Sequence, residues 1–147
     1  MAQDYTQIEW LRELQAELHG VFSSAMPQFR SAFPEWKFSL GSAPWGQNTG
    51  ANGYAVWFEG MLSRARSSEV DTLALVVDIS HVDTTPEIGA DVCWGHPSGY
   101  VEAEWSPGRA VLNDNTRRQL FDSLPSLLEA MARALRQGQP PGHGMKS

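Results

Sequence analysis

The first apolar pattern along the chain repeats at the interval of a helix. Over residues 8–25 the apolar side chains fall within an arc of roughly 160° when successive residues are placed 100° apart, and most charged residues lie on the other side. A second pattern of this kind covers residues 120–135 and stops before Gly138. We therefore predict a helix near each end of the chain, with Pro27 and Pro125 ending or kinking them.

The middle of the chain has the two-residue period of β-strands. Apolar and polar residues alternate there in steps of two, which is typical of half-buried strands. The third segment is apolar at nearly every position, so we expect it at the centre of the sheet. The five predicted strands cover residues 36–40, 54–62, 70–82, 88–95 and 100–105.

These elements predict an α+β fold. The connections are short enough for antiparallel neighbours, apart from an uncharged, glycine-rich loop at residues 41–53. We expect a two-layer sandwich, in which a five-stranded antiparallel meander sheet carries the N-terminal and C-terminal helices on one face. Residues 1–138 form this single domain, and residues 139–147 are expected to be a disordered C-terminal tail.

Composition narrows the class of protein. The chain has 147 residues and a net charge of −6, which argues against nucleic-acid binding because that function needs a basic surface. No apolar run is long enough for a membrane span, and no signal peptide is recognisable at the start. Cys93 is the only cysteine, so no internal disulfide forms. We expect a cytoplasmic protein that binds neither membrane nor nucleic acid.

Two patterns resemble cofactor sites and fail on inspection. Residues 41–46 have the glycine spacing of a phosphate-binding loop, but the lysine and hydroxyl residue that should follow are absent. Cys93 and His96 resemble metal ligands, yet the predicted register places His81 about 16 Å from Cys93, too far to share one ion. We therefore predict no metal and no cofactor.

The unusual feature of the sequence is its charge distribution. No lysine or arginine occurs between Arg66 and Arg109, although eight acidic residues do. Strand phasing predicts that Asp91 lies opposite both Asp78 and Glu104, and that Cys93 lies opposite Glu102. All these side chains are expected on the sheet face turned away from the helices. Carboxylates directly opposite one another destabilise a sheet, so stability alone does not favour this row.

The acidic row leads to our main functional hypothesis, a non-enzymatic protein-binding or regulatory module that engages a basic protein partner. Acidic groups would steer the encounter and an aromatic side chain would anchor it. Small acidic immunity or inhibitor proteins that cover basic toxins work in this way, an analogy of charge and not of sequence. The candidate partner-binding residues are Trp57, Glu59, Asp78, Asp91, Glu102 and Glu104.

Three alternatives remain open at this level. The carboxylates of Asp78, Asp91 and Glu104 are candidates for binding a divalent cation or for acid–base catalysis, which would make the protein an enzyme. The apolar third strand is also consistent with a homodimer, with Trp57, Met61 and Val76 in the contact. The simplest alternative is a solvated sheet face whose polar residues happen to be acidic.

Overall fold

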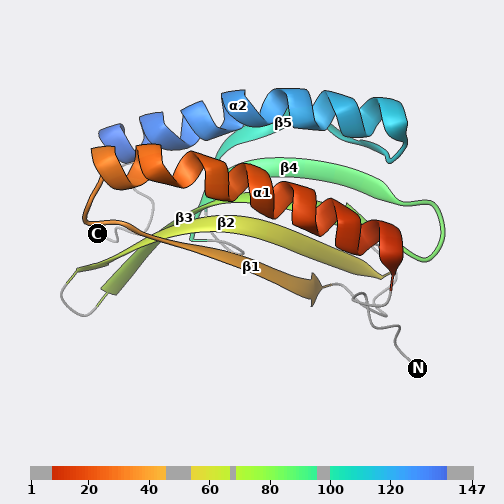
Figure 1. Ribbon diagram of the computed structural model, residues 1–147, viewed down its shortest axis with the longest axis horizontal. Helices are drawn as coiled ribbons and strands as arrows, with labels where there is room; N and C mark the ends of the chain where they lie inside the picture. The colour runs from red at the N-terminus through yellow and green to blue at the C-terminus, as the bar shows by residue number, and fades with distance from the viewer. Residues whose placement is uncertain (1–7, 46–53, 67–68, 96–99, 139–147) are drawn as a thin grey trace.

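The structure is a computed structural model that describes residues 8–45, 54–66, 69–95 and 100–138, without the side chains of residues 43–45, 66 and 69 (Figure 1). Two helices of 24 residues each, α1 (Glu9–Ala32) and α2 (Asp114–Gln137), enclose five strands in the order of the chain. This order confirms the predicted succession of elements. The strands are β1 (Lys37–Trp45), β2 (Ala55–Arg66), β3 (Glu69–Ser80), β4 (Glu87–Trp94) and β5 (Tyr100–Val111).

The five strands form one antiparallel sheet in the order β1-β2-β3-β4-β5, and both helices lie along the same face of it (Figure 1). α1 packs over β1 and β2, and α2 packs over β3, β4 and β5. An ion pair between Glu17 of α1 and Arg117 of α2 links the two helices. The predicted two-layer α+β sandwich is confirmed. Neither described helix is apolar over a long enough stretch to cross a membrane.

The main core fills the space between the helices and the sheet. It forms because the apolar stripe of each helix meets the alternate apolar positions of the strands. Phe22 of α1 and Phe58 of β2 are almost fully buried there, and the rings of Trp36 and Trp94 lie 6.2 Å apart. The helices therefore cover one face of the sheet, and neither of the two described helices lies on the opposite face, which we call the helix-free face.

Both helices continue through their prolines, contrary to the prediction that Pro27 and Pro125 end or kink them. α1 runs on to Ala32, and α2 is a single helix up to Gln137. Buried residues stand on both sides of each proline, for example Leu124 and Leu127 in α2. Packing of these residues on the sheet outweighs the one backbone hydrogen bond that a proline removes.

The register between β3 and β4 differs from the prediction by two residues. Ile79 pairs with Ile88, whereas the predicted register, which placed Asp78 opposite Asp91, would have paired His81 with Ile88. The reason is that β3 ends at Ser80, two residues earlier than predicted: His81 has a φ of 55°, in the left-handed region, and begins the turn. The turn then occupies residues 81–86, and Pro86 stands next to the start of β4.

β5 is longer than predicted because residues 106–108, which we interpreted as the end of the strand, form an irregularity within it. Asp91 pairs with Glu104 and Gly89 pairs with Arg109, so β5 contains three more residues than β4 over this interval. Gly108 has a φ of 93°, which a glycine adopts without strain. The strand then resumes and brings Arg109 back onto the sheet.

Candidate functional site

The face of the sheet turned away from the helices contains most of the candidate residues. One row across it consists of Glu59, Val76, Asp91 and Glu104, contributed by four successive strands. The next row consists of Trp57, Asp78, Gly89 and Arg109. The sequence thus places the acidic side chains on one face through strand alternation alone.

Asp91 and Glu104 lie directly opposite each other, as predicted. Burial, together with the negative charges of Asp78 and Glu104, raises the pKa of Asp91 to about 6, and a hydrogen bond with Cys93 partly offsets this rise. Within the described residues, no Lys, Arg or His forms an ion pair with either Asp91 or Glu104. This pair is therefore a local concentration of negative charge on the helix-free face.

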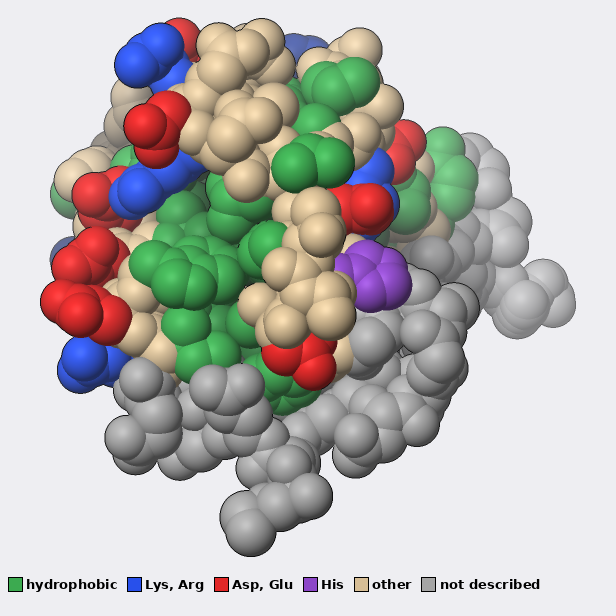
Figure 2. All heavy atoms as spheres, turned by 90° about the vertical axis from the view of Figure 1, so that its right-hand side faces the viewer, with side chains coloured by type: hydrophobic (Ala, Val, Ile, Leu, Met, Phe, Trp, Pro, Cys, Tyr) green, Lys and Arg blue, Asp and Glu red, His purple; other side chains and the backbone are tan. Residues whose placement is uncertain are grey.

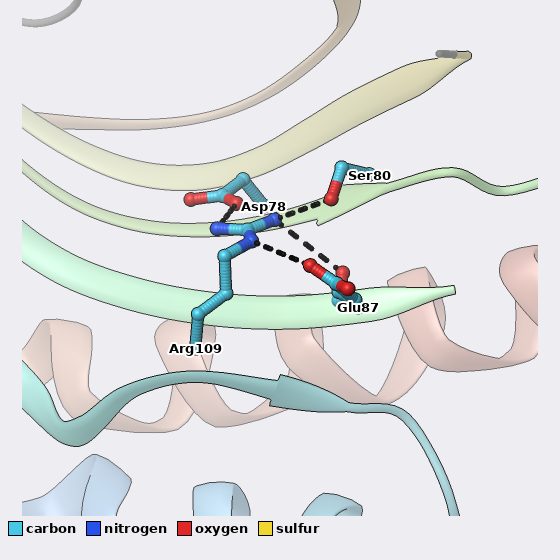
Figure 3. Close-up of polar contacts among 4 residues, drawn as sticks. All are labelled: Asp78, Ser80, Glu87 and Arg109. Atoms are coloured by element: carbon cyan, nitrogen blue, oxygen red, sulfur yellow. Dashed lines mark hydrogen bonds and ion pairs between the residues drawn. The ribbon is translucent and has the colours of Figure 1, made fainter. Parts of the chain in front are cut away.

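Asp78 is not opposite Asp91, because the register shift pairs Asp78 with Gly89 and Asp91 with Val76. The carboxylate of Asp78 instead forms an ion pair with Arg109, with 2.5 Å between Oδ1 and Nη1. Arg109 reaches it from β5 by crossing over β4, as Figure 3 shows. Part of the predicted acidic row is thus neutralised by a residue of the same chain.

The guanidinium of Arg109 has further acceptors on β3 and β4. Its Nη2 donates to the hydroxyl of Ser80 at 3.0 Å and to the backbone carbonyl of Glu87 at 3.4 Å. Its Nε lies 3.7 Å from Oε1 of Glu87. Ser80 is buried, with 1% of its surface exposed, while Arg109 has 37% of its side chain exposed. The result is a guanidinium held at several points on an otherwise acidic surface (Figure 3).

Contrary to the prediction, Glu102 does not lie opposite Cys93. A register irregularity in the β4–β5 pairing lies between Val92 and Cys93, and Cys93 pairs with Val101 instead. The carboxylate of Glu102 accepts a hydrogen bond of 3.2 Å from the indole nitrogen of Trp94. Since Trp94 belongs to the core beneath the helices, this contact separates Glu102 from the acidic pair.

Trp57 and Glu59 flank the centre of the helix-free face. Trp57 packs with Met61 against a small buried cluster formed by Ala74, Val76 and Cys93. Burial raises the pKa of Glu59. Val76 is only 2% exposed, so within the predicted homodimer contact a second copy would find Trp57 and Met61 at the surface and not Val76.

Cys93 is a poor nucleophile in this position. Burial raises the pKa of its thiol to about 12, with further contributions from the charge of Asp91, a hydrogen bond to Asp91, and the charge of Glu59. The reactive form of cysteine is the thiolate. The arrangement therefore keeps the thiol protonated and provides no activated nucleophile at this place.

No metal centre is formed by the described part of the chain, since nowhere in it do three His, Cys, Asp or Glu side chains gather closely enough to hold an ion. His96, one of the ligands considered from the sequence, lies outside the described residues. The enzymatic alternative also loses one of its three carboxylates, because Asp78 is ion-paired with Arg109.

A separate hollow of about 240 Å³ lies at the end of the molecule where both helices begin. Figure 2 views this end and shows hydrophobic side chains exposed among charged ones. The hollow contains no pair of carboxylates and no nucleophile, so it suggests no catalytic site. It is lined by Trp10, Leu14, Pro86, Leu112, Asn113, Asp114 and Arg117.

Comparisons with known proteins leave the site to be interpreted from its own geometry. No protein-family model matches the chain, no curated protein matches it, and no solved structure matches its fold.

Sequence reasoning missed Arg109, Ser80 and Gly89 as parts of this site. The signal for Arg109 was present, because Ala110 and Leu112 continue the strand alternation beyond the Ser-Pro-Gly segment. No sequence signal marks Ser80 or Gly89, because their roles depend on the register of β4 against its neighbours.

Proposed function

We propose that the protein is a non-enzymatic binding or regulatory module that uses the helix-free sheet face to engage a basic protein partner. The observation that supports this function best is the cross-strand pair of Asp91 and Glu104. Like charges placed opposite each other cost stability, and a positively charged group of a partner would remove that cost on binding.

The surroundings of this pair support the same function. Half-buried Trp57 lies in the neighbouring row, three strands from Arg109, and offers a partly exposed aromatic surface on the same face as the carboxylates. Aromatic side chains contribute strongly to the affinity of protein interfaces, while acidic groups accelerate encounter with a basic partner. The net charge of −6 adds to this attraction over longer distances.

A direct test uses a short peptide of alternating arginine and threonine as the probe, titrated by calorimetry and by NMR. We expect saturable binding, with shift changes centred on the backbone amides of Asp91 and Glu104. The double variant Asp91→Asn/Glu104→Gln should lower the affinity by about tenfold. Raising the salt from about 50 to about 300 mM should lower it as well.

The matched control is Glu13→Gln/Asp122→Asn, which also removes two carboxylates but from exposed positions on α1 and α2. This control should bind the peptide like the wild type. Equal losses in both double variants would mean that net charge alone attracts the peptide. Shift changes confined to the helices would place the interaction elsewhere and contradict the proposal.

A further inference from the structure

Arg109 is held on the helix-free face by an arrangement that involves three strands. It starts on β5, at the end of the irregular segment closed by Gly108, and reaches Asp78 and Ser80 on β3. The strand between them, β4, carries Gly89 at the crossing point, where a Cβ atom would lie 2.8 Å from Nη1 of Arg109. Bulges of this kind redirect a side chain, often next to a binding site.

The acceptors around Arg109 suit an arginine better than a lysine. A carboxylate oxygen of Asp78, the hydroxyl of Ser80 and the backbone carbonyl of Glu87 meet different nitrogens or hydrogens of one guanidinium. A planar guanidinium presents five donors in a fixed geometry, whereas an ammonium is a compact group with three. These acceptors, on Asp78, Ser80 and Glu87, therefore form a binding position that suits the guanidinium of an arginine. We call this position the seat.

The residue in this seat is also accessible from solvent. More than a third of the Arg109 side chain is exposed, and it is anchored on an edge strand of the sheet. Ion pairs at such exposure contribute little to stability. Asp91 and Glu104, in the neighbouring row, would attract an incoming cation to a position beside Arg109.

We propose that Arg109 is an intramolecular competitor, which occupies a seat that an arginine side chain of the basic partner takes on binding. This inference rests on the proposed function, because it names the group of the partner that the face recognises. Binding then displaces Arg109 from Asp78 and Ser80, and the arginine of the partner replaces it. The protein is thereby selective for arginine over lysine and holds its own site closed until a partner arrives.

The test compares the wild type with Arg109→Gln, using the arginine–threonine peptide and a second peptide with lysine at each arginine position. We expect Arg109→Gln to bind the arginine peptide about tenfold more tightly, because the competing group is gone. The gain for the lysine peptide should be clearly smaller. Asp78→Asn combined with Arg109→Gln should abolish the gain, because the seat has lost its charge.

Arg118→Gln is the matched control, since it removes an exposed arginine of α2 and changes the net charge by the same amount. It should leave the affinity for either peptide near that of the wild type. An equal gain in Arg118→Gln and Arg109→Gln would overturn the competitor role and leave only long-range electrostatics.

A measurement on the wild type covers the case in which Arg109→Gln folds poorly. The Nε–Hε resonance of Arg109 should move toward the position of a solvent-exposed arginine as the arginine peptide is added. A resonance that stays in place at saturation overturns the displacement of Arg109 while the proposed function stands. If neither the wild type nor Arg109→Gln binds the arginine peptide, both this inference and the proposed function are wrong.

Discussion

A Cβ atom on Gly89 would lie 2.8 Å from Nη1 of Arg109 and 2.9 Å from the backbone oxygen of Gly108. The absence of a side chain at Gly89 is thus what lets the guanidinium cross β4 and reach β3. The close approach involves backbone on one side, so the structure has little freedom to accommodate an added methyl group.

Gly89→Ala should therefore destabilise the fold by about 1–3 kcal/mol, because either the Arg109 side chain or the β5 backbone has to move. Urea unfolding measures this effect. The same substitution at Gly20, in α1, is the control, because nothing lies within 4 Å of the new Cβ there. Gly20→Ala should stabilise the protein by about 0.5–1 kcal/mol, since alanine favours a helix. Effects of the same sign in both variants would contradict this account of Gly89.

The second prediction concerns the pH dependence caused by Asp91. Its pKa is about 6 in the folded protein, against an ordinary value of 3.8, so the folded state holds this proton more tightly than the unfolded state. This group therefore lowers stability as the pH rises from about 4 to about 6, and the loss persists at higher pH. Asp91→Asn mimics the protonated form at every pH.

We expect Asp91→Asn to stabilise the fold by about 1 kcal/mol at about pH 7.5, after allowance for solvent screening, and to have little effect below about pH 4. Urea unfolding across this range provides the measurement. Asp122→Asn, an exposed residue of α2, controls for the loss of one negative charge. A destabilised Asp91→Asn variant at neutral pH would show that the ionised carboxylate is favoured in the fold.

The third prediction concerns the reactivity of Cys93, the only cysteine of the chain. Cys93 is 5% exposed, and burial together with nearby negative charge raises the pKa of its thiol to about 12. At about pH 8 the native protein should react with iodoacetamide at least about 100-fold more slowly than the urea-unfolded protein. Mass spectrometry over time gives both rates. Rapid modification of the folded protein would show an accessible thiolate and contradict the conclusion that Cys93 is a poor nucleophile.

The hydrophobic pattern predicted most of the fold and the pairing of Asp91 with Glu104. The reason is that the helical period differs clearly from the two-residue period of a strand, and that one face of the sheet must be covered. The prediction from this pattern failed where local backbone geometry decides the register between two strands. The left-handed φ of His81 ends β3 earlier than the apolar pattern suggests, and this moves Asp78 opposite Gly89. Since a shift by two residues keeps each side chain on its face, the hydrophobic pattern alone does not detect it.

The composition of the site was harder to predict than its location. Ser106, Pro107 and Gly108 are typical turn residues, and their interpretation as the end of the strand removed Arg109 from the sheet. The structure instead accommodates them within β5, so a cation joins the acidic face. Whether such a segment ends a strand or bulges from it depends on the residues after it, here Ala110 and Leu112, which pack against the core.

The last prediction concerns the start of α2, where Asn113 and Thr116 form a capping box. The side chain of Asn113 accepts a hydrogen bond from the backbone nitrogen of Thr116 at 2.9 Å, and the backbone nitrogen of Asn113 donates to the hydroxyl of Thr116, also at 2.9 Å. These two bonds satisfy backbone donors that the helix itself leaves unpaired.

Asn113→Ala should destabilise the protein by about 1 kcal/mol, because alanine provides no acceptor for the Thr116 backbone nitrogen. Asn115→Ala is the matched control, since Asn115 is exposed and lies just inside the helix, where alanine is the better helix former. Thermal and urea unfolding of the two variants should therefore differ in sign. Because α2 packs over β3, β4 and β5, a loosened first turn should also increase amide exchange in the part of β5 that carries Arg109. Equal stability of the two variants would show that packing on the sheet, and not the cap, fixes where α2 begins.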